Sequence, residues 1–325
     1  MKKFSLVSTT FNEANRIDES IADIEEQTLL PNEIVITDAG STDGTIEKLL
    51  HWKETSELSI RIFVLPKCNV AQGRNHSIDK AYNDLIVSTD FGCRYDKNWL
   101  SSIITPFADP KVEVVGGAHT VLEEKICSIS AKSSYILARG YLSVMDDSFI
   151  PSSRSIAFYK SVWESVGKYP EWLTLASDDL VFGLSLRDKG HHVYIVPRPL
   201  VFWGRHEHSM GYVKEAFRYG LGDGEAKINV KTFYLKLFGF LSRPLFFFIL
   251  IFLLISAASG YIYLLLIPCA IGFKSYYSLY RSWTNFKSEK YDVQVLLYSV
   301  FLLERTRFSY IKGYLTGIFK NRLQP

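Results

Sequence analysis

The chain reads Thr37-Asp38-Ala39-Gly40-Ser41-Thr42-Asp43-Gly44-Thr45 directly behind the apolar run Ile34-Val35-Ile36. A short β-rich run followed by a carboxylate, two glycines and small hydroxyl residues predicts a strand, a tight polar loop and then a helix. Ligands of open α/β sheets bind at the carboxyl ends of strands, so Asp38 is placed to accept hydrogen bonds from a base or ribose. Any strand-to-helix turn prefers the same residue types, and the stretch alone leaves both interpretations open.

The sequence around this stretch alternates short apolar strands with amphipathic helices. The predicted strands cover residues 4–8, 33–37, 61–65 and 84–89, and the predicted helices cover residues 17–27, 45–54 and 71–82. This alternation is typical of a mainly parallel sheet flanked by helices, so the expected fold class is α/β.

Composition limits the classes of protein that need to be considered. The 325 residues are enough for one large domain and an additional segment, and the net charge of +3 gives no basis for nucleic-acid binding. The four cysteines contain no C-x-x-C pair, which favours reduced thiols in a cytoplasmic setting. The run at residues 4–8 is too short and polar for the core of a signal peptide, so we expect the first domain on the cytoplasmic side.

The sequence changes character near residue 229, and we predict a catalytic domain over residues 1–228 and a membrane-associated helical region over residues 229–325. Residues 237–273 are apolar almost throughout, with a break at residues 256–260, which predicts a helical hairpin in the membrane. Lys and Arg flank both ends of this run, so both ends are expected on the cytoplasmic side; a shallow re-entrant hairpin is the alternative. Residues 293–319 predict an amphipathic helix, either on an anionic leaflet or packed on the first domain. The glycine-rich residues 218–224 suggest a mobile lid or a connector.

Several polar groups follow other predicted strands or begin helices. Thr9-Thr10-Phe11-Asn12-Glu13 follows the first strand, Asp90-Phe91-Gly92 follows the strand over residues 84–89, and Gly73-Arg74-Asn75 lies at the start of a helix. A carboxylate such as Asp90 could hold a divalent metal on a diphosphate, although such residues are also common helix caps. Asp178 and Asp179 begin another helix, where one of them could act as a general base or simply cap the helix.

In this order the motifs resemble those of the family 2 glycosyltransferases, which have the GT-A fold, over residues 4–225. The family's Asp-Asp-Gly-Ser-Thr-Asp-Gly-Thr motif is similar to residues 38–45, and its Ala-Arg-Asn motif to residues 73–75. Its opening Pro-Thr-Tyr-Asn-Glu type of motif is similar to residues 9–13, and its acceptor-side Glu-Asp pair to Asp178-Asp179.

The resemblance implies roles for the matched positions. It places the following residues against the nucleotide sugar: Thr9, Phe11, Asn12, Glu13, Asp38, Gly40, Ser41, Arg74 and Asp90. Asp179 would be the general base of an inverting transfer, and Asp178 would orient the acceptor or Asp179. Asp90 would bind a divalent cation, Mn²⁺ or Mg²⁺. The acceptor or sugar would face Ser153, Arg154 and Ser155, with Trp172 either stacking on a sugar ring or lying in a core or lid.

Two features depart from the family pattern. The family's Asp-x-Asp metal motif reads Asp90-Phe91-Gly92, so its second carboxylate is missing. His206 or His208 could complete the metal site, or both could belong to an exposed polar loop. The Gln-x-x-Arg-Trp motif of processive synthases is also missing, which favours the addition of a single sugar.

We therefore expect an inverting glycosyltransferase on the cytoplasmic face of the cell membrane. Its donor would be a nucleotide sugar, with a UDP-sugar expected first, and its acceptor a lipid-linked or membrane-proximal glycan. The missing carboxylate of the metal motif favours an alternative, a catalytically impaired sugar-nucleotide-binding subunit of a glycan-assembly complex. A nucleotidyltransferase is disfavoured because the sequence has no glycine-rich, basic phosphate loop near its first strand.

Overall fold

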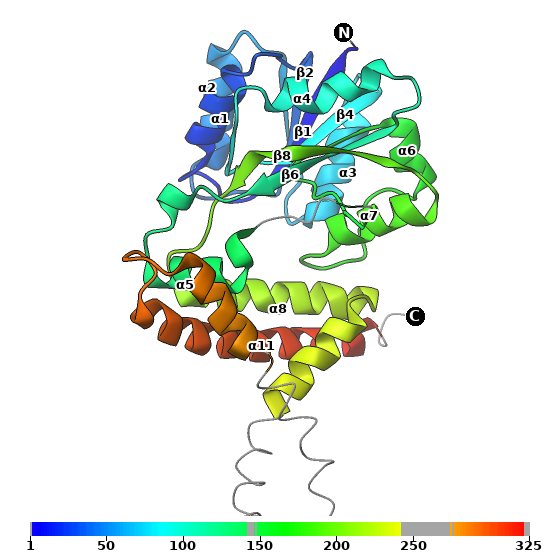
Figure 1. The fold of residues 1–325 in the computed structure, drawn as a ribbon. Coiled ribbons are helices and arrows are strands. Elements are labelled where there is room, and N and C mark those ends of the chain that lie inside the picture. Colours follow the sequence, from blue (N-terminus) through cyan, green and yellow to red (C-terminus); the bar gives the residue numbers. More distant parts are fainter. Residues whose placement is uncertain (1, 142–145, 147, 242–273, 275, 322–325) are drawn as a thin grey trace, which may run out of the picture. The chain divides into compact units, whose positions relative to one another are not determined.

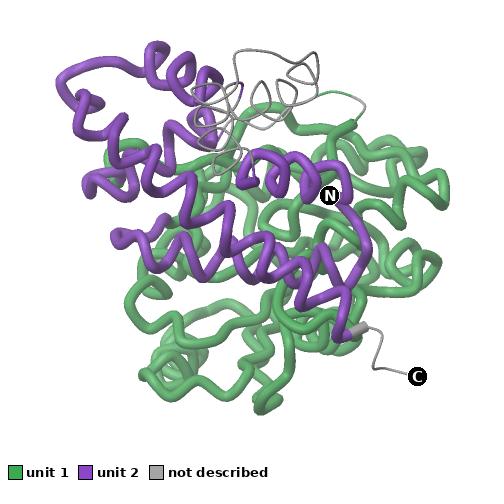
Figure 2. The backbone as a smooth tube through the Cα atoms, turned by 90° about the horizontal axis from the view of Figure 1, so that it is seen from below, with its two compact units in different colours: residues 1–125, 142–204 green, residues 126–141, 205–325 purple. Residues whose placement is uncertain are grey.

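The computed structural model describes residues 2–141, 146, 148–241, 274 and 276–321 (Figure 1). The chain divides into two compact units, which are coloured separately in Figure 2. Unit 1 comprises residues 1–125 and 142–204, and unit 2 comprises residues 126–141 and 205–325. The predicted boundary at residue 228 falls inside unit 2.

Unit 1 is built on one eight-stranded sheet with the strand order β3-β2-β1-β4-β7-β6-β8-β5. Its strands are β1 (Phe4–Thr10), β2 (Glu33–Asp38), β3 (Ile60–Val64), β4 (Leu85–Asp90), β5 (Cys93–Tyr95), β6 (Val114–Thr120), β7 (Ile156–Tyr159) and β8 (Val193–Trp203). The four strands predicted from the sequence are confirmed as β1 to β4. These four pair in parallel, as predicted.

The remainder of the sheet is mixed, which the alternating pattern of the first 90 residues does not indicate. Strand β7 runs antiparallel to both β4 and β6, and β5 runs antiparallel to β8, whereas β6 and β8 are parallel. In the parallel half, Thr10 pairs with Asp38 and Thr9 pairs with Asp90. This register brings the carboxyl ends of β1, β2 and β4 to one edge of the sheet, where the predicted ligand-binding loops begin.

Helices cover both faces of this sheet because successive strand residues point to opposite sides. The helical elements of unit 1 are α1 (Ile17–Glu25), α2 (Thr45–Thr55), α3 (Val70–Lys80), α4 (Trp99–Ile104), η1 (Thr105–Ala108), η2 (Glu123–Lys125), α6 (Lys160–Ser165) and α7 (Asp178–Asp188). Leu6 and Ile36 pack in one core with residues of α1, α2 and α4. Val7 and Val35 pack in the other core with residues of α3, α6 and α7 (Figure 1).

Unit 2 is helical in the part that the structure describes. Its elements are α5 (Ile129–Leu137), η3 (Arg139–Tyr141), α8 (Ser209–Ala226), helical residues 230–241, helical residues 276–286 and α11 (Val293–Asn321). Helices α8 and α11 lie side by side (Figure 1). The predicted helix over residues 293–319 is thus confirmed as α11, which also contacts α5.

Glycines on both helices allow α8 and α11 to approach at backbone distance. A Cβ at Gly220 or Gly224 would overlap the carbonyl oxygen of Tyr310 or Tyr314, respectively. A Cβ at Gly313 would likewise overlap the carbonyl oxygen of Phe217. The glycine-rich residues 218–224, for which the sequence suggested a lid or a connector, instead lie within α8. Because glycine has no side chain, these positions allow α8 to pack closely against α11.

We expect Gly313→Ala to destabilise unit 2. The added methyl group must displace backbone atoms of α8, and overpacking of this kind costs about 1–3 kcal/mol, more than the gain in helix propensity of about 1 kcal/mol. Thermal unfolding of the detergent-purified chain measures the effect. The matched control is Lys312→Ala, an exposed neighbour on the same helix. A melting temperature of Gly313→Ala equal to or above that of the parent would contradict the close packing.

The predicted membrane hairpin over residues 237–273 lies almost entirely outside the described residues. Only its first residues, 237–241, are described, as the end of the helix over residues 230–241. Among the helices that the structure does describe, none combines the length and the hydrophobicity required to cross a bilayer.

Candidate active site

The loops after β1 and β2 are joined by polar contacts at the carboxyl edge of the sheet. Asn12 has a left-handed backbone (φ 56°). Its N–H donates to Ser41 Oγ (2.8 Å), and its Oδ1 accepts from the N–H of Thr42 (3.0 Å). The Asp43 carboxylate accepts from the N–H of Ala14 (3.0 Å). Two of the predicted motifs therefore form one structural element.

Asp38 is fully buried and shapes its own loop. Its Oδ1 accepts from the N–H groups of Gly40 (2.8 Å) and Ser41 (2.7 Å), and its Oδ2 accepts from Ser41 Oγ (2.6 Å). Gly40 has φ +90°, a conformation that favours glycine. Because a carboxylate has about four acceptor sites, Asp38 retains capacity for one further donor. Its predicted contact with a nucleoside stays a prediction.

The side chains of the motif over residues 9–13 differ in how much of them is exposed to solvent. The Phe11 side chain is 56% exposed at the end of β1. Thr9 Oγ1 donates to the carbonyl of Thr37 on β2 (3.1 Å), which holds it within the sheet. Helix α3 packs closely over it, since a Cβ at Gly73 would overlap Thr9 Oγ1. Gly73 thus determines how near the following residue, Arg74, comes to the sheet edge.

Arg74 connects two carboxylates that are far apart in the sequence. Its guanidinium is buried and donates to Asp90 Oδ1 (2.7 Å) and to Asp178 Oδ2. Burial alone would lower the pKa of Arg74, but the charges of Asp178 and Asp90 raise it above its ordinary value. Arg74 therefore stays charged. In this structure its two Nη groups are used by these carboxylates, so its predicted support of a base or phosphate stays a prediction.

Asp90 remains ionised because of its cationic neighbours. Burial raises its pKa, yet the charges of Arg74 and Arg154 outweigh burial and leave the pKa below its ordinary value. Asp178 behaves differently, since burial and the neighbouring Asp179 raise its pKa despite the charge of Arg74. Asp178 is thus a buried structural partner of Arg74.

Asp179 follows Asp178 in the first turn of α7, but its carboxylate has different hydrogen-bond partners. Its Oδ2 accepts from Ser152 Oγ (3.0 Å), and Arg154 Nη1 donates to the same hydroxyl (3.0 Å). The Arg154 guanidinium also lies 3.9 Å from Asp90 Oδ2 and 4.1 Å from the centre of the Trp203 ring. Asp90, Arg74, Asp178, Asp179, Ser152 and Arg154 together form one polar network in unit 1, which we call the carboxylate network.

The sequence interpretation missed two residues of this region. Ser152 stands in the stretch that precedes β7, but its spacing does not distinguish it from Ser153 and Ser155. His119 lies on β6, where burial and the charge of Arg154 lower its pKa to about 4. This imidazole is therefore neutral at physiological pH. A single histidine in a sequence does not indicate that it lies beside the carboxylate network.

The predicted acceptor residues divide into two groups. Ser153 and Ser155 are buried, and their hydroxyls bond to Tyr169 Oη (2.9 Å) and Trp99 Nε1 (3.0 Å). They hold the loop that carries Arg154, which differs from the prediction that they face a sugar. Trp172 is 52% exposed and does not belong to the core, which was one alternative for it.

The missing second carboxylate of the metal motif has a structural explanation. Gly92 has φ +90°, and a Cβ there would lie 2.6 Å from Glu13 Oε2. An aspartate at position 92 would have a strained backbone, and the Glu13 carboxylate would have to move to make room for its Cβ. Burial raises the pKa of Glu13 above its ordinary value, and Arg16 lies 2.7 Å from Glu13 Oε2.

No three His, Cys, Asp or Glu side chains of the described part of the chain converge to hold a metal ion. His206 and His208 belong to unit 2, where His206 Nε2 lies 3.1 Å from Glu215 Oε2 and His208 precedes α8. Their predicted role as ligands stays a prediction. Mg²⁺ commonly takes one or two carboxylates together with substrate phosphates and water. Asp90 alone is consistent with that type of site.

Comparison with known proteins identifies similar sequences and folds. The family model "Glycosyl transferase family 2" matches residues 5–142. The O-antigen chain rhamnosyltransferase RfbN of Salmonella typhimurium is 23% identical over 230 residues, which cover 67% of this chain and 70% of RfbN.

Two solved structures are similar over most of the chain. Mannosyltransferase PcManGT from Pyrobaculum calidifontis, in complex with GDP-Man and Mn²⁺, matches with a TM-score of 0.54, 16% identity and coverage of 99% of this chain and 87% of PcManGT. S. aureus TarS 1-349 in complex with UDP-GlcNAc matches with a TM-score of 0.50, 15% identity and coverage of 98% and 91%. At this identity the likeness establishes the fold, which is a GT-A fold with a mixed sheet flanked by helices.

Proposed function

We propose that this chain is a family 2 glycosyltransferase, since the model of that family matches its residues 5–142. It would transfer a single sugar from a nucleotide-sugar donor to a lipid-linked or membrane-proximal glycan, with inversion at the anomeric carbon. The carboxylate network supports this proposal. It offers one carboxylate, Asp179, whose partner is a neutral hydroxyl, whereas Asp90 and Asp178 are paired with Arg74.

The donor would bind at the carboxyl edge of β1, β2 and β4. The joined loops at residues 9–13 and 38–45 would hold the nucleoside, as the family resemblance implies. PcManGT binds GDP-Man and TarS binds UDP-GlcNAc, so a sugar nucleotide is the chemistry to test, with a UDP-sugar first. A divalent cation on Asp90 and the diphosphate would neutralise charge on the leaving group.

Asp179 would act as the general base. It would accept the proton of the acceptor hydroxyl as that oxygen forms its bond to the anomeric carbon and the bond to the nucleoside diphosphate breaks. Ser152 would orient the carboxylate through its hydrogen bond to Asp179 Oδ2, and the N–H of Leu180 donates to Oδ1. Arg154, which is held over Trp203, would add positive charge beside Asp90.

The C-terminal sequence supports the proposed acceptor and location. The apolar run at residues 237–273, with cationic residues on both sides, supports membrane association with the catalytic unit on the cytoplasmic face. RfbN is an O-antigen chain rhamnosyltransferase, which makes a cell-envelope glycan a reasonable acceptor to test.

The test is nucleotide release by the detergent-purified chain. UDP-, GDP- and dTDP-sugars are supplied with a lipid extract as the source of acceptor and with Mn²⁺, Mg²⁺ or EDTA. We expect cation-dependent release from one class of donor. Donor binding without release under every condition would contradict transfer and would instead support the catalytically impaired binding subunit, which the single-carboxylate metal motif favours.

A further inference from the structure

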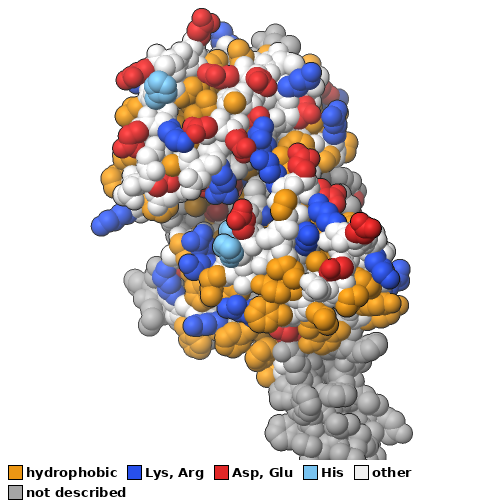
Figure 3. All heavy atoms as spheres, turned by 90° about the vertical axis from the view of Figure 1, so that its left-hand side faces the viewer, with side chains coloured by type: hydrophobic (Ala, Val, Ile, Leu, Met, Phe, Trp, Pro, Cys, Tyr) orange, Lys and Arg blue, Asp and Glu red, His pale blue; other side chains and the backbone are white. Residues whose placement is uncertain are grey.

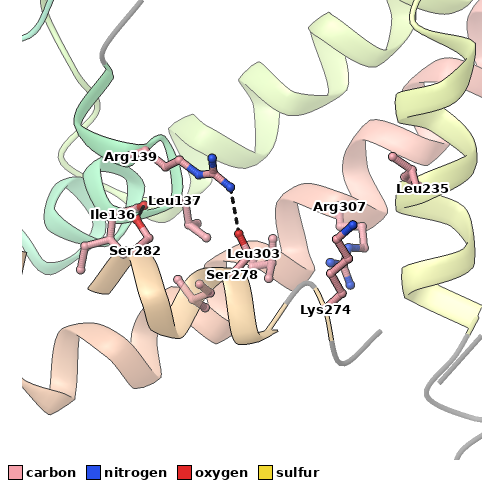
Figure 4. A pocket seen from close by; sticks show the side chains of 10 residues that line it. Ile136, Leu137, Arg139, Leu235, Lys274, Ser278, Ser282, Leu303 and Arg307 are labelled. Atoms are coloured by element: carbon pink, nitrogen blue, oxygen red, sulfur yellow. Dashed lines mark hydrogen bonds between the residues drawn. The ribbon is translucent and has the colours of Figure 1, made fainter. Parts of the chain in front are cut away.

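Unit 2 contains a cavity of about 340 Å³ that is separate from the carboxylate network (Figure 4). Every described residue that lines it belongs to unit 2, and these residues come from the end of α5 and η3, the helix over residues 230–241, position 274, residues 278–282 and α11. We call it the unit 2 cavity. No residue of the cavity has a role in the proposed transfer.

Three cations line the unit 2 cavity, and no Asp or Glu is among its described lining residues. They are Arg139, Lys274 and Arg307, which come from three different segments (Figure 4). Arg139 Nη2 donates to Ser278 Oγ (3.0 Å), so its position is defined by a neutral partner. Glu304 lies 3.2 Å from Arg307 and also accepts from Tyr276 Oη (2.6 Å). One carboxylate beside three cations leaves a surplus of positive charge.

A further cation, Lys236, is the sequence neighbour of the lining residue Leu235. Lys236 is on the helix over residues 230–241, where burial and the charge of Arg307 lower its pKa to about 8. Its ammonium lies 4.1 Å from the centre of the Tyr310 ring. The charge of Asp223 opposes that of Lys236, and of the three lining cations Arg307 is buried whereas Arg139 and Lys274 are exposed.

The remaining lining is apolar. Ile136, Leu235, Leu279 and Leu303 contribute side chains to the wall, and Ser278 and Ser282 add hydroxyls. Ser282 Oγ is already bonded to the carbonyl of Ile136 (2.6 Å). A cavity with cations and an aliphatic wall matches a molecule that has an anionic group and a hydrocarbon part.

The surroundings of the cavity indicate where such a molecule would come from. In the sequence, Leu235 shortly precedes and Lys274 directly follows the apolar residues 237–273. Large hydrophobic side chains of the same segments are exposed to solvent, namely Tyr234, Phe238, Tyr277 and Tyr280. Figure 3 shows hydrophobic side chains together with Lys and Arg side chains over part of the surface. Aromatic and cationic residues beside an apolar segment are typical of the membrane interface.

We propose that the unit 2 cavity binds the phosphate headgroup of an anionic membrane lipid, with Arg139, Lys274 and Arg307 on the phosphate and the first part of the acyl chains against the aliphatic wall. The observation that carries the proposal is that three cations from separate segments line one cavity whose other lining residues are aliphatic or neutral. The site does not depend on the proposed transfer, because it shares no residue with the carboxylate network.

The experiment measures binding of dihexanoyl phosphatidic acid, below its micelle concentration, to the full detergent-purified chain. Dihexanoyl phosphatidylcholine and inorganic phosphate serve as competing probes. The variants are Lys274→Gln and Arg139→Gln. The matched control is Arg281→Gln, which removes an exposed cation from the same helical segment outside the cavity. Thermal unfolding of each variant establishes that it is folded.

We expect Lys274→Gln and Arg139→Gln each to weaken phosphatidic acid binding about tenfold, since a charge-assisted hydrogen bond is lost. Arg281→Gln should weaken binding by no more than the roughly fivefold that a single unspecific surface charge contributes. Equal losses in all three variants would overturn the proposal, because only general charge would then attract the lipid. Displacement of the lipid by equimolar inorganic phosphate would show that the cavity binds free phosphate, and the proposal of a lipid ligand would be wrong. If phosphatidylcholine bound as tightly as phosphatidic acid, the cavity would not select a lipid by its net negative charge, and the proposal would be wrong.

Discussion

Asp179→Asn is expected to lower kcat by about 10²–10⁴-fold, the range that a positioned general base contributes, with donor affinity unchanged. The amide keeps the size of the carboxylate and can still accept a hydrogen bond from Ser152. It cannot accept the proton of the acceptor hydroxyl. Nucleotide release and donor binding, measured on the same preparation, separate the two effects.

The matched control for this prediction is Asp188→Asn at the other end of α7, an exposed carboxylate outside the carboxylate network. Its activity should equal that of the parent. If Asp179→Asn kept more than about a tenth of the parent rate, the loss would fall short of the range for a general base, and proton removal would have to be assigned elsewhere.

Arg74→Met is expected to destabilise unit 1 by about 3–5 kcal/mol, because it leaves Asp90 and Asp178 without their buried counter-ion. Methionine fills much of the volume of the arginine stem, so the lost charge is the main change. A loss of this size corresponds to a fall in melting temperature of roughly 10 °C for a domain of about 200 residues. Thermal unfolding is the measurement.

A double-mutant cycle makes the cause of this loss testable. Asp178→Asn combined with Arg74→Met should cost less than the sum of the two single substitutions, since the first removes one of the charges that the second leaves unpaired. Arg187→Met, an exposed arginine on α7, is the matched control and should change stability little. Strict additivity of Arg74→Met and Asp178→Asn would contradict the pairing.

The sequence predicted the parallel half of the sheet correctly because its signals are local. Short apolar runs with β-branched residues, followed by polar turn residues, mark β1, β2 and β4 and the loops behind them. The resemblance of the motifs to a family was sufficient for the fold, which is confirmed, and the family model that matches residues 5–142 agrees with the predicted class of enzyme. The antiparallel pairing of β7 with β4 and β6 carries no such local signal.

The polar partners within the site could not be predicted in this way. Arg74 and Asp178 are 104 positions apart, and their contact depends on how α3 and α7 pack on one face of the sheet. Ser152 differs from Ser153 and Ser155 only in the direction of its side chain. Gly92 registers in the sequence as a departure from the family motif, and only the structure shows Glu13 where its side chain would lie.

The sequence by itself determined the strands β1 to β4 and the loops at their carboxyl ends, because hydrophobic periodicity and turn chemistry act over a few residues. The assignment of Asp179 as the candidate base came from the family resemblance and stays a prediction. Only the tertiary structure decided which carboxylate Arg74 neutralises, which serine supports Asp179 and why the glycines of α8 and α11 are needed. Those outcomes depend on contacts between segments far apart in the chain, where the pairing of buried charges and the close approach of backbones are set by packing.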